Sequence, residues 1–231
     1  MPNVLAHNYV TDVVMRTATP NLALGSVLPD FAGMYRDYEG ERVDIRRISP
    51  TLDLGIYLHR RTDQVFDAQP EKLKITTGLA DHLSAAGISR RTARLSAHLL
   101  ADMMLDGALA EQSEPLTAFE TLAEYVLDEE SALHEGKFPH GFTRFIEDYF
   151  DRSVLANYSD PEKLAQITQR RLAKRAGVDP ARAKNTINYE QLPTLVEVID
   201  IHADRVRRLG LTALTRTIRL LEHSMDSGVP A

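Results

Sequence analysis

Apolar residues recur every three to four positions through nearly every long segment of this chain. This spacing places them on one face of an α-helix, and no alternating run is long enough to predict a β-strand. Helices are predicted at residues 2–17, 51–67, 70–85, 89–110, 115–133, 139–156, 160–176, 190–208 and 211–225. The sequence therefore predicts an all-α protein built as a helical bundle.

Residues at the ends of several predicted helices favour helix starts or stops. Ser89 precedes a helical segment in the position of an N-cap. Gly87, Gly177 and Gly210 follow periodic segments, where glycine commonly ends a helix. The break at residues 136–141 contains two glycines and a proline, but the helical pattern resumes directly after it. We therefore expect residues 1–231 to form one helical domain.

The helix predicted at residues 51–67 concentrates its polar chemistry in a short stretch that contains His59, Arg60, Arg61 and Asp63. His59 and Asp63 are four residues apart and share a helix face, and Asp67 continues this stripe. Imidazole and carboxylate groups bind divalent metals, and arginine binds phosphate oxygens. The set suits metal-dependent chemistry on a phosphate group. The alternative is a solvated helix face with an i,i+4 ion pair.

Three other apolar segments also carry histidine or aspartate. His7 lies in the first predicted helix, and Asp30 follows an apolar run. His98, Asp102 and Asp106 step by four along one leucine-rich helix. Burying such groups without a partner is costly, and a shared metal ion would supply one partner for all of them. The alternatives are a core histidine at position 7 and a turn residue at position 30.

These segments resemble motifs of the acyl carrier protein phosphodiesterases, a divergent branch of the all-helical HD-type metal phosphohydrolases. Asn-Val-Leu-Ala-His7 is similar to the family's Asn-Phe-Leu-Ala-His, and Gly-Ser-Val-Leu-Pro-Asp30-Phe to its Gly-Asn-Leu-Leu-Ala-Asp-Phe. The most specific match is the stretch that ends at Asp63, Gly-Ile-Tyr-Leu-His-Arg-Arg-Thr-Asp, which resembles the family's Gly-Ile-x-x-His-Arg-Arg-Ile-Asp. Asp-Met-Met-Leu-Asp106 resembles Asp-x-Met-x-Asp-His, but Gly107 stands where the family has histidine.

The resemblance implies a phosphodiesterase that releases phosphopantetheine from a serine of a holo acyl carrier protein. The implied metal ligands are His7, Asp30, His59 and Asp102. This oxygen-rich set suits Mn²⁺ or Mg²⁺ better than it suits a closed zinc site. Asp63 would orient the attacking water or bind the ion directly, and Arg60 and Arg61 would offset charge on the phosphoryl group. From its position alone, Asp106 could be a ligand, a residue that supports the ligands from behind, or a surface residue near the end of its helix, and we favour the supporting role.

Composition excludes several other classes of protein. The chain has no cysteine, so disulfides, thiolate chemistry and cysteine-ligated zinc are excluded. A formal net charge of −6 argues against general nucleic-acid binding. No apolar run approaches the roughly 20 residues of a membrane span, and the first residues lack the features of a signal peptide. We expect a soluble cytoplasmic protein that binds neither nucleic acid nor membrane.

An acidic enzyme that acts on a strongly negative carrier protein needs a local basic surface. Three candidate patches are Arg170–Arg175, Arg46–Arg47 and Arg90–Arg94. Two other functions stay open at this point. One is an HD-like hydrolase of a nucleotide or other small phosphoester, which the glycine at position 107 favours. The other is a non-catalytic helical protein that binds partners through its basic helices.

Overall fold

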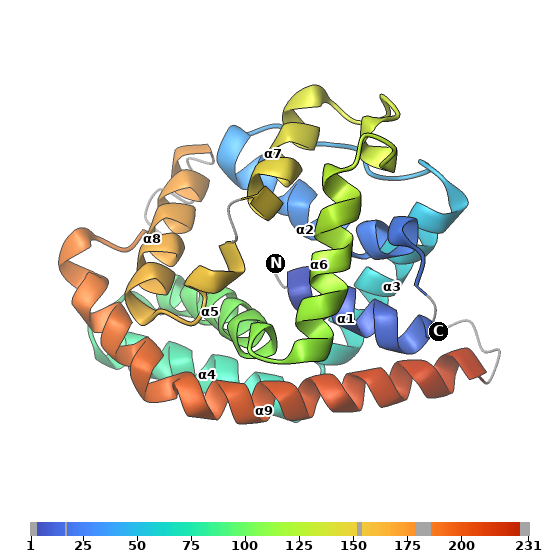
Figure 1. The fold of residues 1–231 in the computed structure, drawn as a ribbon. Helices are drawn as coiled ribbons and strands as arrows, with labels where there is room; N and C mark the ends of the chain where they lie inside the picture. The colour runs from blue at the N-terminus through green and yellow to red at the C-terminus, as the bar shows by residue number, and fades with distance from the viewer. Residues whose placement is uncertain (1–3, 17, 152–153, 179–185, 227–231) are drawn as a thin grey trace.

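The computed structural model describes residues 4–16, 18–151, 154–178 and 186–226. Within these residues the chain forms nine α-helices and no β-strand, which confirms the predicted all-α fold (Figure 1). The helices are α1 (Val4–Met15), α2 (Pro20–Glu39), α3 (Pro50–Asp67), α4 (Pro70–Ala85), α5 (Arg90–Ala110), α6 (Ser113–Leu127), α7 (His140–Asp151), α8 (Pro161–Val178) and α9 (Leu192–Asp226). The predicted cap Ser89 accepts the backbone N–H of Thr92, as expected.

Helix α1 lies at the centre of the bundle and packs against α2, α3, α5, α6 and α9. Most of its side chains are buried, and they include the polar residues His7, Asn8 and Thr11. Helices α2 and α3 form a closely packed pair on one side of α1, while α4, α5 and α9 pack on another. A short helix surrounded in this way presents His7 and Thr11 to the interior, while Asp12 remains exposed.

Helix α2 was not predicted, because Gly25 and Pro29 interrupt its sequence and Pro-Asp commonly forms turns. The structure shows a continuous helix through both residues. Proline inside a helix removes one backbone hydrogen bond. The helix persists because Leu24, Leu28 and Phe31 on its inner face are fully buried. Tertiary packing therefore outweighs the local cost of the proline.

Helix α9 is one helix, and the predicted division at Gly210 is wrong. A Cβ atom at Gly210 would lie 3.1 Å from the Leu105 side chain, so the glycine permits close packing on α5 and does not end the helix. Gly177 likewise lies within α8 and not beyond its end. Gly87, by contrast, has a φ of 90° just after α4, as predicted for a helix stop. Helix α6 ends at Leu127, earlier than predicted.

Residues 2–3 and 17 of the helix predicted at 2–17, and residues 152–153 of the helix predicted at 139–156, fall outside the described residues. Residues Val154–Asn157 form a short 3₁₀-helix, so the predicted α-helix does not continue to residue 156. No helix among the described residues is long and apolar enough to cross a membrane.

Candidate metal centre

Two glycines set the distance between α2 and α3, and this distance fixes the position of His59. A Cβ atom added to Gly25 would lie 2.4 Å from a backbone oxygen of α3, and one added to Gly55 would lie 2.4 Å from a backbone oxygen of α2. Only a residue without a Cβ permits this approach. The Nδ1 atom of His59 consequently lies 2.7 Å from the carbonyl oxygen of Ser26 on α2.

This contact determines which nitrogen of His59 faces the interior cluster. A carbonyl oxygen can only accept, so Nδ1 of His59 donates its proton to Ser26. The Nε2 atom is then left to bind a metal or to pair with a carboxylate. A histidine whose other nitrogen is held by a backbone carbonyl is typical of metal ligands in proteins.

Asp106 of α5 fixes the start of α1, directly before His7. Its two carboxylate oxygens accept the backbone N–H groups of Leu5, at 3.2 Å, and Ala6, at 3.0 Å. N–H groups in the first turn of a helix have no partner within the helix, and a carboxylate also interacts favourably with the helix dipole. Asp106 thus holds the helix that carries His7, in agreement with its expected supporting role.

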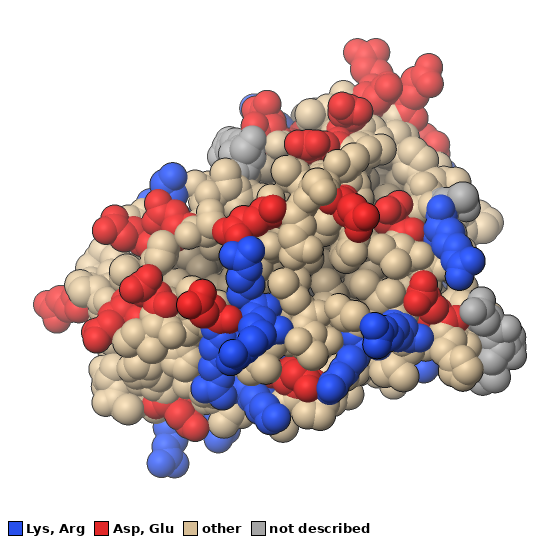
Figure 2. Space-filling model, turned by 60° about the horizontal axis from the view of Figure 1, so that its bottom comes forward, with Lys and Arg blue, Asp and Glu red and all other residues tan. Residues whose placement is uncertain are grey.

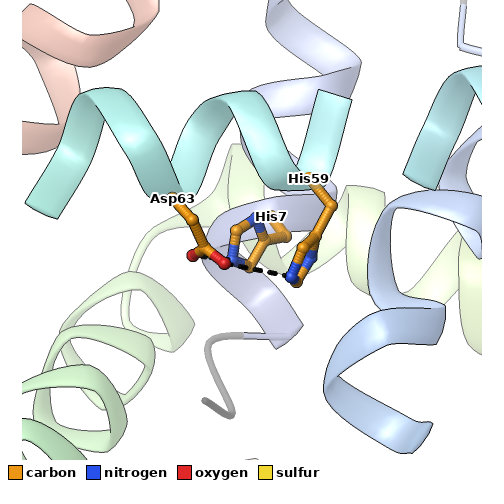
Figure 3. Close-up of side chains that lie close together, drawn as sticks. All are labelled: His7, His59 and Asp63. Atoms are coloured by element: carbon orange, nitrogen blue, oxygen red, sulfur yellow. Dashed lines mark ion pairs between the residues drawn. The ribbon is translucent and has the colours of Figure 1, made fainter. Parts of the chain in front are cut away.

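His7, His59 and Asp63 converge on one point (Figure 3). Nε2 of His7 lies 3.1 Å from Oδ1 of Asp63, and Nε2 of His59 lies 3.3 Å from Oδ2. The two imidazole rings stack with centroids 3.8 Å apart and an interplanar angle of 24°. One donor atom from each of the three residues lies within 4.8 Å of the others. Residues far apart in sequence therefore form a compact set of possible ligands.

The electrostatics of the cluster favour an ionised carboxylate and at least one neutral imidazole. Burial lowers the pKa of His7, and the neighbouring His59 lowers it further. Burial acts to raise the pKa of Asp63, but hydrogen bonds from His59 and His7 outweigh it and hold that pKa below its usual range. Asp30 and Asp63 outweigh the effect of burial on His59 and raise its pKa. Metal binding requires a neutral imidazole, so a cation would have to displace the proton that Asp30 and Asp63 favour on His59.

Asp30 lies beside this cluster, as the sequence led us to expect. It is buried on α2, and its Oδ2 atom lies 3.9 Å from Nε2 of His7. It is not one of the three residues whose donor atoms come within 4.8 Å of each other. Its carboxylate therefore adds negative charge beside His7, His59 and Asp63 without being one of the three closest donors.

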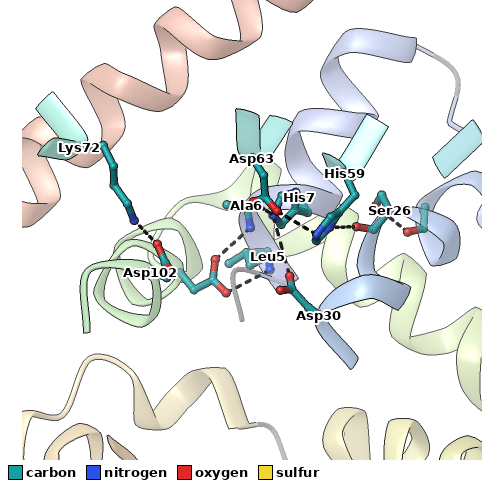
Figure 4. Close-up of polar contacts among 11 residues, drawn as sticks. Leu5, Ala6, His7, Ser26, Asp30, His59, Asp63, Lys72 and Asp102 are labelled. Atoms are coloured by element: carbon teal, nitrogen blue, oxygen red, sulfur yellow. Dashed lines mark hydrogen bonds and ion pairs between the residues drawn. The ribbon is translucent and has the colours of Figure 1, made fainter. Parts of the chain in front are cut away.

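Asp102 has a different partner from the expected metal. Its Oδ1 atom forms an ion pair with Nζ of Lys72 on α4, and both residues are buried (Figure 4). The ammonium group also lies 4.9 Å from the centre of the Phe66 ring. The lysine supplies the positive charge that Asp102 needs, and Asp102 does not belong to the closest ligand set. Lys72 was missed by the sequence analysis.

A signal for Lys72 was nevertheless present in the sequence. Lys72 lies three and seven residues before Ile75 and Leu79, which belong to the buried face of α4. A lysine in the apolar stripe of an amphipathic helix requires a buried partner of opposite charge. Asp102, in its own apolar surroundings, was the complementary residue.

The remaining candidates lie around the centre without joining it. Arg60 is exposed, and Arg61 is half-buried with Nη1 donating to Oε1 of Gln64 at 2.6 Å. Asp67 is exposed on α3, and partial burial of its carboxyl group raises its pKa. His98 is exposed on α5. Of the stripe His59, Asp63 and Asp67 predicted on one face of α3, only His59 and Asp63 therefore belong to the cluster.

Gly107 explains why the family's histidine is absent at this position. A Cβ atom at Gly107 would lie 2.8 Å from the carbonyl oxygen of Tyr158. Backbone of the segment after α7 therefore lies directly against α5 here. Any side chain at position 107 would displace that segment, so this chain has no room for a histidine.

The chemistry of the three donors suits a divalent metal. Two imidazole nitrogens and one carboxylate oxygen form a common set for first-row divalent ions and leave coordination positions open. His7 and His59 are almost fully buried, whereas the Asp63 side chain is 45% exposed. The open side of the centre thus faces solvent at Asp63.

Comparison with known proteins agrees with this chemistry. The family described as acyl carrier protein phosphodiesterase matches residues 2–197 of the chain, including both helices that carry the cluster. No curated protein and no solved structure matches the chain. The family match covers most of the 231 residues. This chain belongs to the acyl carrier protein phosphodiesterase family.

Proposed function

We propose that this protein is a metal-dependent phosphodiesterase that hydrolyses the bond between phosphopantetheine and a serine of an acyl carrier protein. The products are the apo carrier and free phosphopantetheine. The observation that carries this proposal is the convergence of two buried imidazoles and one half-exposed carboxylate in a member of this family. The family match supports the substrate, and the donor set supports the metal.

The proposed ligands are His7, His59 and Asp63, with Asp30 close behind His7. Two of the three closest donors are imidazole nitrogens, which bind Mn²⁺ better than they bind Mg²⁺. We therefore favour Mn²⁺. When bound, such an ion lowers the pKa of a water molecule and polarises a phosphoryl oxygen.

The chain's own residues have separate tasks in this proposal. Asp63 binds at the exposed edge of the centre and faces the side from which the substrate arrives. Ser26 and Asp106 hold the two histidine-bearing helices in place and do not touch the substrate. Arg60 is exposed three residues before Asp63 and binds an oxygen of the substrate phosphate. Arg61 is already held by Gln64, so its contribution is smaller.

The test is incubation of the manganese-loaded protein with a holo carrier protein, followed by intact-mass spectrometry of the carrier. The carrier should lose the mass of phosphopantetheine, and a chelator should stop the reaction until Mn²⁺ is restored. Cleavage of a small diester such as bis-p-nitrophenyl phosphate without cleavage of the carrier would contradict the proposed substrate. Carrier cleavage that persists after exhaustive chelation would contradict the proposed mechanism.

Arg60→Ala separates catalysis from metal binding. The variant should retain manganese, because Arg60 is not a ligand, and its kcat should fall by about 10²-fold through loss of transition-state charge stabilisation. Arg61→Ala is the matched control and should lose much less. Equal rates for wild type and Arg60→Ala would remove Arg60 from the proposal.

A further inference from the structure

Helix α9 separates its charges along its length. Its first part carries Glu197, Asp200 and Asp204 and no basic side chain except His202. From residue 205 to residue 219 the helix carries only basic charges. These are Arg205, Arg207, Arg208, Arg216 and Arg219. In a chain with a net charge of −6, five arginines without an intervening acidic residue form a distinct local feature.

Four of these arginines share one exposed face. Arg205, Arg208, Arg216 and Arg219 are spaced by multiples of three and four and all are exposed, so they form a stripe along the helix. Arg207 points elsewhere and pairs with Glu111. We call the four residues the α9 arginine stripe. Figure 2, in which the side of the molecule formed by α9 is turned forward, shows Lys and Arg gathered in the lower middle of this face, with one acidic side chain between them and further Asp and Glu above and to the left.

Exposed apolar side chains accompany the stripe. Leu220 is 53% exposed directly after Arg219, and Leu73 of the adjacent α4 is 64% exposed. Lys74 of α4 adds another exposed cation, and its carbonyl oxygen lies 3.5 Å from Nη2 of Arg205. Arginines with exposed aliphatic residues beside them are typical of a surface that binds another protein.

The stripe still has charges available for a partner. Arg216 pairs with Glu71 at 2.6 Å, but no ion pair occupies Arg208 or Arg219 among the residues that the structure describes. Of the basic residues in the patch Arg170–Arg175, only Arg170 and Lys174 are exposed. Arg171 and Arg175 lie within 3.8 Å and 2.7 Å of Asp37 and hold α8 against α2.

The other two patches lie beside acidic groups. Arg46 pairs with Asp44 on its own loop, at 2.8 Å. Arg90 and Arg94 share a small cavity with Asp81. Of these four patches, as far as the structure describes them, only the stripe combines several exposed arginines on one helix face with exposed apolar side chains.

The position of the stripe also suits access to the metal centre. Glu71, which binds Arg216, directly precedes Lys72, whose ammonium group lies over Phe66. Phe66 lies three residues after Asp63 on α3, and α9 packs against both α3 and α1. Arg216 of the stripe is therefore linked through α4 to the end of α3 that carries Asp63.

We propose that the α9 arginine stripe is the surface on which an acidic acyl carrier protein docks. This inference rests on the proposed function, because it takes the carrier as the substrate. The bond to be cleaved is attached to a serine of the carrier itself, so the carrier must bind close to the metal. Opposite charges at this surface steer the encounter between two proteins that are both acidic overall.

The experiment measures binding of a holo carrier protein to the full-length protein by calorimetry. In Arg208→Glu/Arg219→Glu, the Kd for the carrier should rise at least roughly tenfold, and the dependence of Kd on salt should weaken. The matched control is Arg90→Glu/Arg94→Glu, which reverses two equally exposed charges on α5. It should bind the carrier like wild type. Helical circular dichroism and manganese content verify that both variants are folded.

The outcomes separate the docking surface from the reaction. Stripe variants that bind the carrier like wild type, a control that loses as much affinity, or a wild-type protein that binds no carrier would overturn the docking surface. If the carrier binds through the stripe but is never cleaved, the proposed reaction is contradicted and the proposed docking surface is still supported. Carrier cleaved with an unchanged KM by the stripe variant would contradict the surface while the reaction stands.

Discussion

The imidazole rings of His7 and His59 stack 3.8 Å apart, and each directs its Nε2 atom to the carboxylate of Asp63. Two protonated imidazoles at this distance would repel each other, which is consistent with the lowered pKa of His7. A divalent cation among the three donors would remove this conflict, because both rings would then bind it as neutral ligands. Each element that places these rings can be tested separately.

The glycine at the crossing of α2 and α3 should be intolerant of any side chain. Gly55→Ala places a Cβ atom against backbone, so it should lower the free energy of unfolding by about 1–3 kcal/mol and weaken metal binding by moving His59 away from Ser26. Gly33→Ala on α2 is the control, since a Cβ atom there meets nothing within 4 Å. It should be neutral or slightly stabilising. Urea unfolding and manganese titration of both variants give the comparison.

The contact of Asp106 with α1 should contribute to both stability and metal affinity. Asp106→Ala leaves two buried N–H groups, on Leu5 and Ala6, without their acceptors and should cost about 1–3 kcal/mol. Asp106→Asn keeps one acceptor oxygen and should lose less. Because the start of α1 would shift, manganese should bind His7 less tightly in the alanine variant. A stable Asp106→Ala protein with wild-type metal affinity would show that α1 does not depend on this carboxylate.

The Lys72–Asp102 pair distinguishes a structural from a ligating role for Asp102. Lys72→Met leaves a buried carboxylate without its counter-charge and should lower stability by about 3–5 kcal/mol. Lys72→Met/Asp102→Asn should recover part of that loss. Asp102→Asn alone should retain manganese, because the carboxylate is bound to Lys72. Loss of the metal in Asp102→Asn would restore Asp102 to the ligand set that the family resemblance implies.

A histidine pair between α4 and α9 should make stability depend on pH. Nε2 of His202 lies 3.2 Å from Nδ1 of His82, and burial, His82 and Arg205 lower the pKa of His202. Protons then bind the unfolded chain more readily than the folded one. The contribution of His202 is complete above its unfolded pKa of about 6.5 and is lost as the pH falls through the lower folded pKa. Melting curves at about pH 7.5 and about pH 5.5 should differ less in His202→Gln than in wild type.

The sequence predicted the fold where apolar periodicity and packing agree. Helices α3, α4 and α5 were predicted to within a residue at each end, because their apolar stripes are regular and their ends carry caps. Helix α2 was not predicted, because Gly25 and Pro29 disfavour a helix locally. The packing that stabilises this helix comes from segments distant in sequence. The division predicted at Gly210 is wrong for the same reason, because the role of this glycine is close packing against Leu105.

The residue pattern within single helices predicted only part of the site. Spacing by four placed His59 and Asp63 on one face, and apolar surroundings identified His7 and Asp30 as buried groups. Spacing within one helix does not determine which side chains from other helices arrive beside it. Lys72 reaches Asp102 from α4, and only the packing of α4 on α5 shows that this carboxylate already has a partner.

Manganese binding tests the central claim most directly. Electron paramagnetic resonance of the metal-free protein titrated with Mn²⁺ should reveal one tight site per chain. That site should be lost in His59→Ala and in Asp63→Asn, and retained in Gly33→Ala as a folded control. A wild-type protein that binds no manganese, or His59→Ala and Asp63→Asn variants that bind it as tightly as wild type, would contradict the assignment of His7, His59 and Asp63 as a metal centre.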